Sequence, residues 1–185
     1  MPIDDTIEEI GLPATIIRAT GNISTHFYVK PKLKSSPFDY EGWAKTADDI
    51  VSGDLVIYND LYYLIVGISQ DKRVGDFFKN NIRLFRCDAS ITLKTYVAAS
   101  KSWTDSPDSI PCMILDGGIA MSSDAALVVP NVSGTDKTHY LYCQPNNIDR
   151  KTVFKDQYGT SFKAAGSPNR YFAQGIIEVS VKAED

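Results

Sequence analysis

The chain has 185 residues, a hydrophobic content of 43% and a formal net charge of −4. This length favours one domain or two small β domains, and the hydrophobic content is sufficient for a buried core. Six acids lie at the two ends of the chain, and without them 17 acids remain against 19 bases. They are Asp4, Asp5, Glu8, Glu9, Glu184 and Asp185. A near-neutral body argues against a protein whose main task is to grip phosphate.

Residues 1–10 are acidic and lack a long apolar core, so no secretory signal is predicted, and they are expected to form a helical turn or a loose arm. The cysteines Cys87, Cys112 and Cys143 are odd in number and widely spaced. No disulfide framework is predicted, and each thiol is interpreted as a small buried hydrophobe. We therefore expect synthesis in a reducing cytoplasm.

Two strands are predicted first, at residues 14–18 and 26–30, and Pro31 limits the second one. The basic, proline-flanked segment 30–37 is predicted to be an extended loop or arm. Residues 38–51, which include Trp43, are predicted to form one short helix or an irregular cover over a barrel.

Residues 53–68, GDLVIYNDLYYLIVGI, predict a hairpin. A membrane span needs roughly 20 consecutive apolar residues, and Asn59-Asp60 interrupts this run far too early. Asn and Asp tolerate a left-handed backbone and serve in short hairpin loops. The pattern therefore predicts a strand at 55–58, a tight turn, and a return strand at 61–68.

A charged loop with Gly75 as its turn is predicted at 70–79. Strands are predicted at 81–87 and 90–97, where apolar and polar residues alternate with the period of a sheet that has one wet face. The segment 100–111 is rich in Ser, Asp and Pro and is the best candidate for a linker.

The remaining sequence predicts short strands separated by turn residues. The strands are expected at 112–115, 125–129, 139–143, 152–154 and 171–181. The turns are expected at Asp116-Gly-Gly118, Ser133-Gly-Thr-Asp136, Pro145-Asn-Asn147, Tyr158-Gly159 and Gly166-Ser-Pro-Asn169. The predicted class is all-β, a small barrel or sandwich with extended loops or arms. The expected division is a barrel-like core at 1–99, a linker at 100–111, and a second β-rich part at 112–185 in the same or another domain.

Few residues suit catalysis or metal binding. His139 and Cys143 would point the same way on a strand, but a structural zinc needs four ligands, and no second pair follows. The same two residues with a distant acid are the candidates for a small hydrolase, the least favoured function. The adjacent acids Asp48 and Asp49 would point to opposite faces of a strand and make a poor acid–base pair. No catalytic, cofactor or metal residues are predicted.

A nucleic-acid-binding barrel is the second alternative. Lys30, Lys32 and Lys34 stand near Tyr28 and Phe27, and basic residues with aromatic ones can track a single strand. The near-neutral body favours another interpretation, in which this segment contacts a protein neighbour.

One set of features follows a recognisable order. They are Ile16-Ile-Arg18, the Pro-rich arm, Trp43, Gly53-Asp54-Leu55-Val56, Tyr62-Tyr-Leu-Ile-Val66 and Leu84-Phe-Arg-Cys87. This order resembles that of the head-closure and adaptor proteins in the neck of tailed bacteriophages. The resemblance covers Leu12 to about Val97 and does not extend into the rest of the chain.

The resemblance implies a non-enzymatic virion protein, made in the host cytoplasm, that forms a homo-oligomeric ring between portal and tail. Its partners would be portal or adaptor proteins, tail proteins, and double-stranded DNA that passes without sequence-specific binding; no cofactor and no membrane contact are expected. A ring needs heterologous contacts that close by rotation, and strand edges and arms can supply them. The expected contact residues are Lys30, Lys32, Lys34 and Phe38 in the arm, and Gly53, Asp54, Tyr58, Asn59, Asp60 and Tyr62 in the hairpin.

Overall fold

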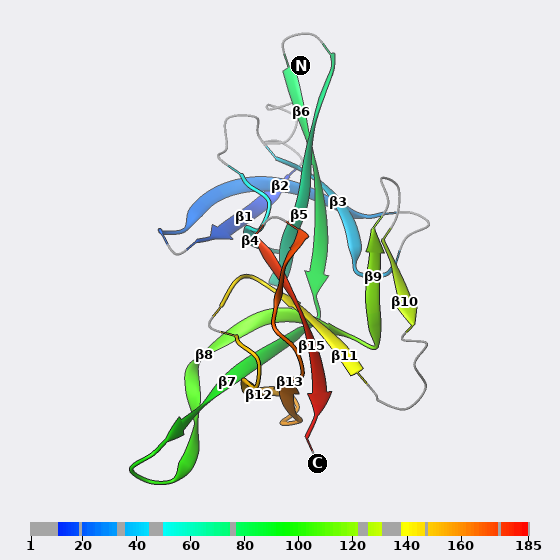
Figure 1. Cartoon of the computed structure of the whole chain (residues 1–185). Helices are drawn as coiled ribbons and strands as arrows, with labels where there is room; N and C mark the ends of the chain where they lie inside the picture. Colours follow the sequence, from blue (N-terminus) through cyan, green and yellow to red (C-terminus); the bar gives the residue numbers. More distant parts are fainter. Residues whose placement is uncertain are drawn as a thin grey trace. The chain divides into compact units, whose positions relative to one another are not determined.

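The computed structural model describes residues 11–18, 20–32, 36–44, 50–74, 77–121, 126–130, 138–146, 148–173 and 175–184. In this part of the chain every regular element is a β-strand, which confirms the predicted all-β class. None of the described residues belongs to a helix that is long and apolar enough to cross a membrane. The strands belong to two units, which are described one at a time (Figure 1).

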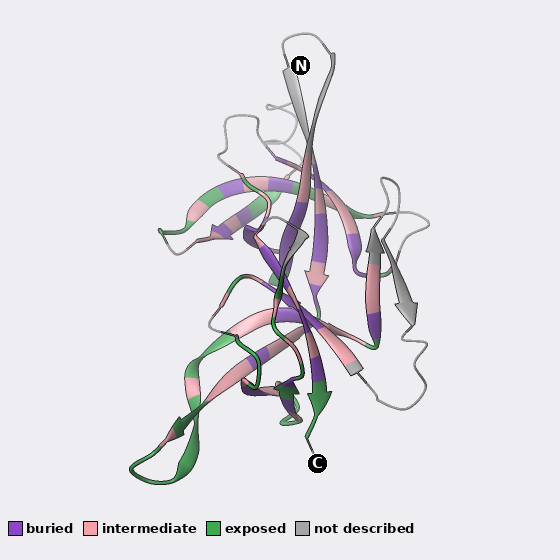
Figure 2. Ribbon diagram, viewed as in Figure 1, coloured by how far each residue is buried: buried purple, intermediate pink, exposed green. Residues whose placement is uncertain are grey.

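Unit 1 contains a closed antiparallel barrel with the strand order β1-β2-β3-β6-β5-β4. Its strands are β1 (Leu12–Ile17), β2 (Ile23–Pro31), β3 (Asp39–Ala44), β4 (Leu55–Tyr58), β5 (Leu61–Val74) and β6 (Phe77–Cys87). The barrel closes because β1 pairs with β2 on one side and with β4 on the other. Residues at alternate positions fill its interior, among them Ile16, Phe27, Ile65 and Leu84, which are all fully buried (Figure 2).

The hairpin predicted at 53–68 is confirmed. Strands β4 and β5 pair from Tyr58 and Leu61 to Leu55 and Leu64, and the turn between them consists of Asn59 and Asp60. Both turn residues have positive φ, 50° and 61°, as a type I′ turn requires. The Asn-Asp pair therefore fixes the register of these two strands.

Two predictions for unit 1 are wrong. The segment 70–79 is not a loop, because β5 and β6 continue to pair as far as Val74 and Phe77. Polar composition does not end these strands, since each satisfies the backbone groups of the other. The helix or irregular cover expected at 38–51 is replaced, at its start, by strand β3. Residues 45–49, 75 and 76 lie outside the described part of the chain.

A buried ion pair joins the end of β1 to the entry of β4. Arg18 donates from Nε to Oδ1 of Asp54 at 2.7 Å and from Nη2 to Oδ2 of the same carboxylate. The backbone N–H of Val51 also donates to Oδ2, at 2.9 Å, and the carbonyl of Asp54 accepts from the N–H of Ile65. Asp54 is 4% exposed, so nearly all of its hydrogen-bonding capacity is used inside the protein.

A second pair of the same kind links β3 to β6. Arg83 donates from Nε and Nη2 to the two carboxylate oxygens of Asp39, at 3.1 and 2.8 Å. Asp39 is only 1% exposed. Arg18 and Arg83 therefore each bind a buried carboxylate through two hydrogen bonds. One pair lies between β1 and the segment before β4, and the other lies between β3 and β6.

Unit 2 contains a second closed barrel. Its strands, in sequence order, are β7 (Ala89–Val97), β8 (Ser102–Leu115), β11 (Thr138–Cys143), β12 (Val153–Asp156), β13 (Ser161–Ala164) and β15 (Ile176–Ala183). The order around the barrel is β11-β8-β7-β12-β13-β15, and β11 pairs with both β8 and β15. Strand β14 (Asn169–Ala173) lies next to β15, and β9 (Gly117–Met121) and β10 (Ala126–Pro130) form a two-stranded sheet.

The core of the second barrel comes from strands that lie far apart in the sequence. Ile91, Leu141, Phe154 and Val179 are all fully buried in one cluster. The thiols of the barrel strands are part of the same cluster: Cys112 and Cys143 are fully buried.

The predicted domain boundary is wrong. Residues 102–115 form β8 and pair with β7, so 100–111 is not a linker, and the main division falls between Cys87 and Asp88. Ser, Asp and Pro are frequent there because this part of β8 is mostly exposed, not because it lacks regular structure.

Three finer predictions for unit 2 also need correction. Asp116 is a bend from which β9 starts at once, so Asp116-Gly-Gly118 is not a hairpin turn. The single strand expected at 171–181 is divided into β14 and β15, with positive φ at Gly175. Strand β13 was not predicted at all. The turn at Tyr158-Gly159 is confirmed, whereas 133–136 and Asn147 lie outside the described residues.

Tyr142 is buried on strand β11 and connects three strands of unit 2. Its hydroxyl donates to Oε2 of Glu178 on β15 at 2.7 Å and accepts from the N–H of Ile119 on β9 at 3.0 Å. Burial, and then the hydrogen bond to Glu178, raise the pKa of the phenol well above its ordinary value.

We expect Asp54→Ala to lower the free energy of unfolding of unit 1 by about 3–5 kcal/mol, because it leaves a largely buried Arg18 without its carboxylate. Urea unfolding followed by the fluorescence of Trp43, in a Trp103→Phe background, measures this effect in unit 1. The matched control is Glu41→Ala, which removes the exposed Lys30–Glu41 pair and should cost less than about 1 kcal/mol. Equal costs for the two variants would contradict the role assigned to Arg18 and Asp54.

Tyr142→Phe should destabilise unit 2 by about 1–3 kcal/mol at neutral pH, because Glu178 and the N–H of Ile119 lose a buried partner. The folded pKa lies above the ordinary value of 10.0, so the stabilisation by Tyr142 is complete below that pH and declines as the pH rises above it. The difference in thermal midpoint between wild type and variant should therefore shrink above pH 10. A difference that grows with pH would contradict this assignment.

Candidate functional site

The expected contact arm is partly built into the first barrel. Lys30 belongs to β2, and its Nζ lies 4.8 Å from the ring centroid of Trp43 and 3.5 Å from Oε2 of Glu41. Tyr28 lies beside the same indole, with ring centroids 5.6 Å apart. Glu41 thus offsets the charge of Lys30, so this face is an aromatic patch with little net charge.

The other described arm residues, Phe38 and Lys32, are tied into the fold. Phe38 is 7% exposed and packs edge-on against Phe85, with ring centroids 5.1 Å apart, so it is a packing residue and not an exposed contact. The backbone N–H of Lys32 donates to the carbonyl of Asp39, which ties the start of the arm to β3. Lys34 lies outside the described residues.

The hairpin residues also divide into two groups. Gly53 and Asp54 are buried, and Gly53 has a φ of 93° and donates from its N–H to the carbonyl of Ile65. Tyr58 is half-buried and packs edge-on against Tyr63. Asn59, Asp60 and Tyr62 are exposed. Gly53 and Asp54 therefore hold the fold, whereas the tip and Tyr62 are available for contacts.

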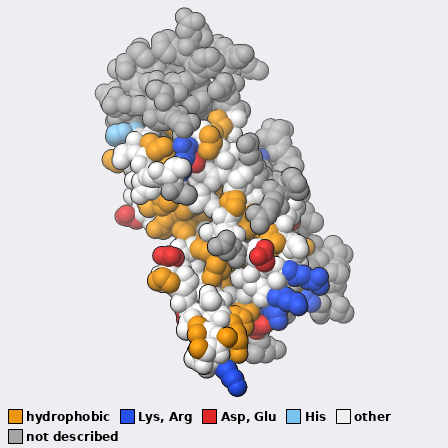
Figure 3. Space-filling model, turned by 60° about the vertical axis from the view of Figure 1, so that its left-hand side comes forward, with side chains coloured by type: hydrophobic (Ala, Val, Ile, Leu, Met, Phe, Trp, Pro, Cys, Tyr) orange, Lys and Arg blue, Asp and Glu red, His pale blue; other side chains and the backbone are white. Residues whose placement is uncertain are grey.

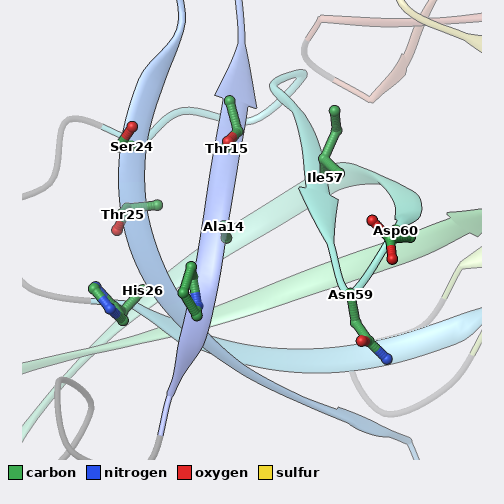
Figure 4. Close-up of a pocket in the computed structure, with 9 residues that line it drawn as sticks. Ala14, Thr15, Ser24, Thr25, His26, Ile57, Asn59 and Asp60 are labelled. Carbon is green, nitrogen blue, oxygen red and sulfur yellow. The ribbon is translucent and has the colours of Figure 1, made fainter.

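A shallow depression of about 380 Å³ lies beside the hairpin tip (Figure 4). Its lining is Pro13, Ala14, Thr15, Ser24, Thr25, His26, Ile57, Asn59 and Asp60. Figure 4 shows these side chains spread along β1, β2 and the turn, without convergence on one point. The depression offers hydroxyls, an imidazole and an amide for hydrogen bonds to a polar surface, but it does not pair a nucleophile with a base.

His139 and Cys143 share one face of β11 but do not meet. They are four positions apart, which corresponds to about 13 Å along a strand, and the buried Leu141 lies between them. Burial raises the pKa of the Cys143 thiol to about 12, the opposite of what a nucleophilic thiol needs. Nδ1 of His139 instead lies 2.7 Å from Oδ1 of Asp116. Among the described residues, no three His, Cys, Asp or Glu side chains gather as a metal site.

A second depression, of about 310 Å³, surrounds His139 at the rim of the second barrel. Its lining is Asp88, Ala89, Ile114, Asp116, His139, Asp156, Gln157, Tyr158 and Phe162. Asp156 is engaged by its own loop, because Oδ1 accepts from the N–H groups of Tyr158 and Thr160. The His139 ring packs edge-on against Phe162. Asp156 and His139 therefore make contacts within the fold at this depression.

One exposed feature was missed by the sequence analysis. Tyr96 and Trp103 lie directly opposite each other on β7 and β8, with ring centroids 5.4 Å apart, and are 51% and 53% exposed. The available signal was the alternation of 90–97, which places Tyr96 on the wet face. Trp103 was assigned to a linker, so the pair could not be recognised.

A scan against protein-family models found no match, and searches of the curated proteins and of the solved structures found none either. The functional proposal therefore rests on the fold and on the residues described above.

The native protein should react very slowly with a thiol reagent such as DTNB at pH 8, because Cys87, Cys112 and Cys143 are all buried and a protonated thiol is a weak nucleophile. Denaturation in urea should release three reactive thiols for the three cysteines of the chain. Fast reaction of one thiol in the native state, lost in Cys143→Ala, would contradict this and support the hydrolase alternative.

Proposed function

We propose that the chain is a structural protein of a bacteriophage neck or tail, without catalytic activity, that assembles into a ring between portal and tail around the DNA channel. The observation that carries the proposal is that the described residues on which the resemblance rests belong to one unit, in the strands of a closed barrel or directly beside them. The proposal places the protein in the virion, with portal or adaptor and tail proteins as partners.

The Arg18–Asp54 pair gives a physical role to residues on which the resemblance rests. Ile16-Ile-Arg18 ends β1, and Gly53-Asp54 precedes β4; the bidentate pair fastens the two segments to each other. The return strand from Tyr62 then supplies Ile65, whose N–H donates to the carbonyl of Asp54. The order of features is therefore the order of parts needed to close this barrel, which supports a scaffold function.

Exposed apolar side chains of unit 1 supply the contact surface. Leu61 and Tyr62 are each 38% exposed directly after the hairpin turn, and Tyr28 is 39% exposed on β2. Aromatic residues of this kind are enriched in protein interfaces. Within the closed barrel of unit 1 each strand has a neighbour on both sides, so there we expect side-chain docking, not strand addition.

The two alternatives receive less support from the geometry. The hydrolase would need Cys143 and His139 together, and they are separated by Leu141. The nucleic-acid site around Lys30 would need a free positive charge, and Glu41 lies 3.5 Å from its ammonium. We make no second proposal on either site.

Native mass spectrometry and electron microscopy of the purified chain, alone and with the portal ring encoded by the same genome, test the proposal. We expect closed rings, or monomers that assemble only on the portal. A chain that remains monomeric and binds neither portal nor tail would contradict it.

The double variant Leu61→Asp/Tyr62→Asp should weaken assembly by about tenfold or more, since each charge would be desolvated in the interface. The matched control is Tyr158→Asp, which changes an aromatic side chain that is 84% exposed in unit 2. Equal loss of assembly in both variants would show that the hairpin surface is not the contact.

A further inference from the structure

Two cysteines of the second barrel lie opposite each other on neighbouring strands. Strands β8 and β11 pair with a constant register, which places Tyr142 opposite Met113. The next position of the same register brings Cys143 opposite Cys112, and both residues belong to these strands. Residues directly opposite each other in an antiparallel pair point to the same face of the sheet.

Both cysteine side chains belong to the core of this barrel. Leu141, two positions before Cys143, lies in the same buried cluster as the two cysteines, and Ile114, two positions after Cys112, packs against it. Side chains two positions apart on a strand share one face, so the register and the burial agree. The exposed hydrophobic side chains that Figure 3 shows on one face of the molecule do not include Cys112 or Cys143, since each is 0% exposed.

Pro111 determines which kind of pair the two cysteines form. Pro111 lies opposite Ser90 on β7, and a proline has no N–H, so the backbone groups of these two residues are not bonded to each other. The N–H of Ser90 instead donates to Oε1 of Gln157 at 2.9 Å. Backbone groups alternate in direction along a strand, so those of Cys112 point to β7 and those of Met113 point to β11.

Cys112 and Cys143 are therefore opposite each other at a position without mutual backbone hydrogen bonds. At such positions the two Cα atoms are about 4.5 Å apart and the side chains are at their closest. A disulfide needs a Cα separation of about 4.4–6.8 Å. The backbone of β8 and β11 thus already has the spacing that a disulfide between these two residues requires.

We propose that Cys112 and Cys143 form a disulfide when the protein meets an oxidising environment, and that this bond joins β8 to β11. The oxidant is a small organic disulfide such as oxidised glutathione. The thiolate of one cysteine attacks a sulfur of that molecule, and the first reduced glutathione leaves. The second cysteine then attacks the protein-bound sulfur and releases the second one. The two protein thiols lose two electrons and two protons in total, and the two released glutathione thiols gain them.

The bond should form slowly. Burial raises the pKa of the Cys143 thiol to about 12, so little thiolate is present at neutral pH. Reaction therefore requires local separation of β8 and β11. In a reducing cytoplasm glutathione keeps thiols reduced, so the bond is expected only outside such a compartment. The inference concerns strand pairing in unit 2 and does not depend on the proposed function.

Mass spectrometry of the full chain tests the proposal. The reduced protein is incubated with a mixture of oxidised and reduced glutathione just below its thermal midpoint, so that strands separate transiently. We expect the intact mass to fall by about 2 Da, the mass of two hydrogen atoms. Alkylation in urea should then modify Cys87 alone, and digestion without reduction should yield peptides joined through Cys112 and Cys143.

The disulfide should also stabilise unit 2. A disulfide restricts the unfolded chain, and the effect increases with the length of the loop that it closes. Cys112 and Cys143 are about 30 positions apart in the sequence. Calorimetry of the oxidised chain should therefore show a transition that lies at least about 5 °C higher than in the reduced chain and that returns to its first position when dithiothreitol is added.

The matched control is Cys87→Ala, because Cys87 belongs to unit 1. This variant should form the bond as the wild type does. Cys112→Ala and Cys143→Ala should each show no loss of about 2 Da, and the remaining cysteine of the pair should at most carry one glutathione. Peptide mapping of the wild type keeps the test valid if a variant does not fold.

Two results would overturn the proposal. The first is an intact mass that stays unchanged, or that rises by bound glutathione, with no peptides joined through Cys112 and Cys143. The second is a disulfide that includes Cys87 in place of either partner, which would show that the bond forms in the unfolded chain and not through the register of β8 and β11.

Discussion

The closure of the first barrel depends on the bidentate ion pair between Arg18 and Asp54, which joins the end of β1 to the segment that precedes β4. β1 must pair with β4 to close the ring of strands, and Arg18 at the end of β1 binds Asp54 at the entry of β4. The carboxylate is buried and also accepts the N–H of Val51. A buried charge is tolerable only where such bonds satisfy it, so the closure and the ion pair require each other. The hairpin tip, Leu61 and Tyr62 owe their position to this arrangement.

Closure also determines how each unit can meet a partner. Where barrel strands pair on both sides they have no free edge, so association at those positions must use side chains left on the outside. In unit 1 these are apolar and aromatic residues close to the hairpin, such as Leu61 and Tyr62. In unit 2 they include the exposed Tyr96–Trp103 pair.

The sequence predicted best those elements whose signal is local. The type I′ turn at Asn59-Asp60 and the strands on either side follow from residue types within a short window. Sequence analysis failed where pairing between strands decides the structure. The composition of residues 102–111 predicted a linker, but these residues form a strand because they pair with β7. Asp54 was placed in the hairpin correctly, but its bond to Arg18 spans 36 positions and has no local signature. The Tyr96–Trp103 pair was missed for the same reason, because only the pairing of β7 with β8 places the two rings opposite each other.

Hydrogen exchange of the chain, free and mixed with the portal ring of the same genome, tests most directly the claim that this is a scaffold that docks through outward side chains on closed barrels. The account predicts that the core strands exchange equally slowly in both states. It also predicts that added protection is confined to exposed segments such as the hairpin tip at 58–62. No change on mixing, or loss of protection in the barrel strands themselves, would contradict it.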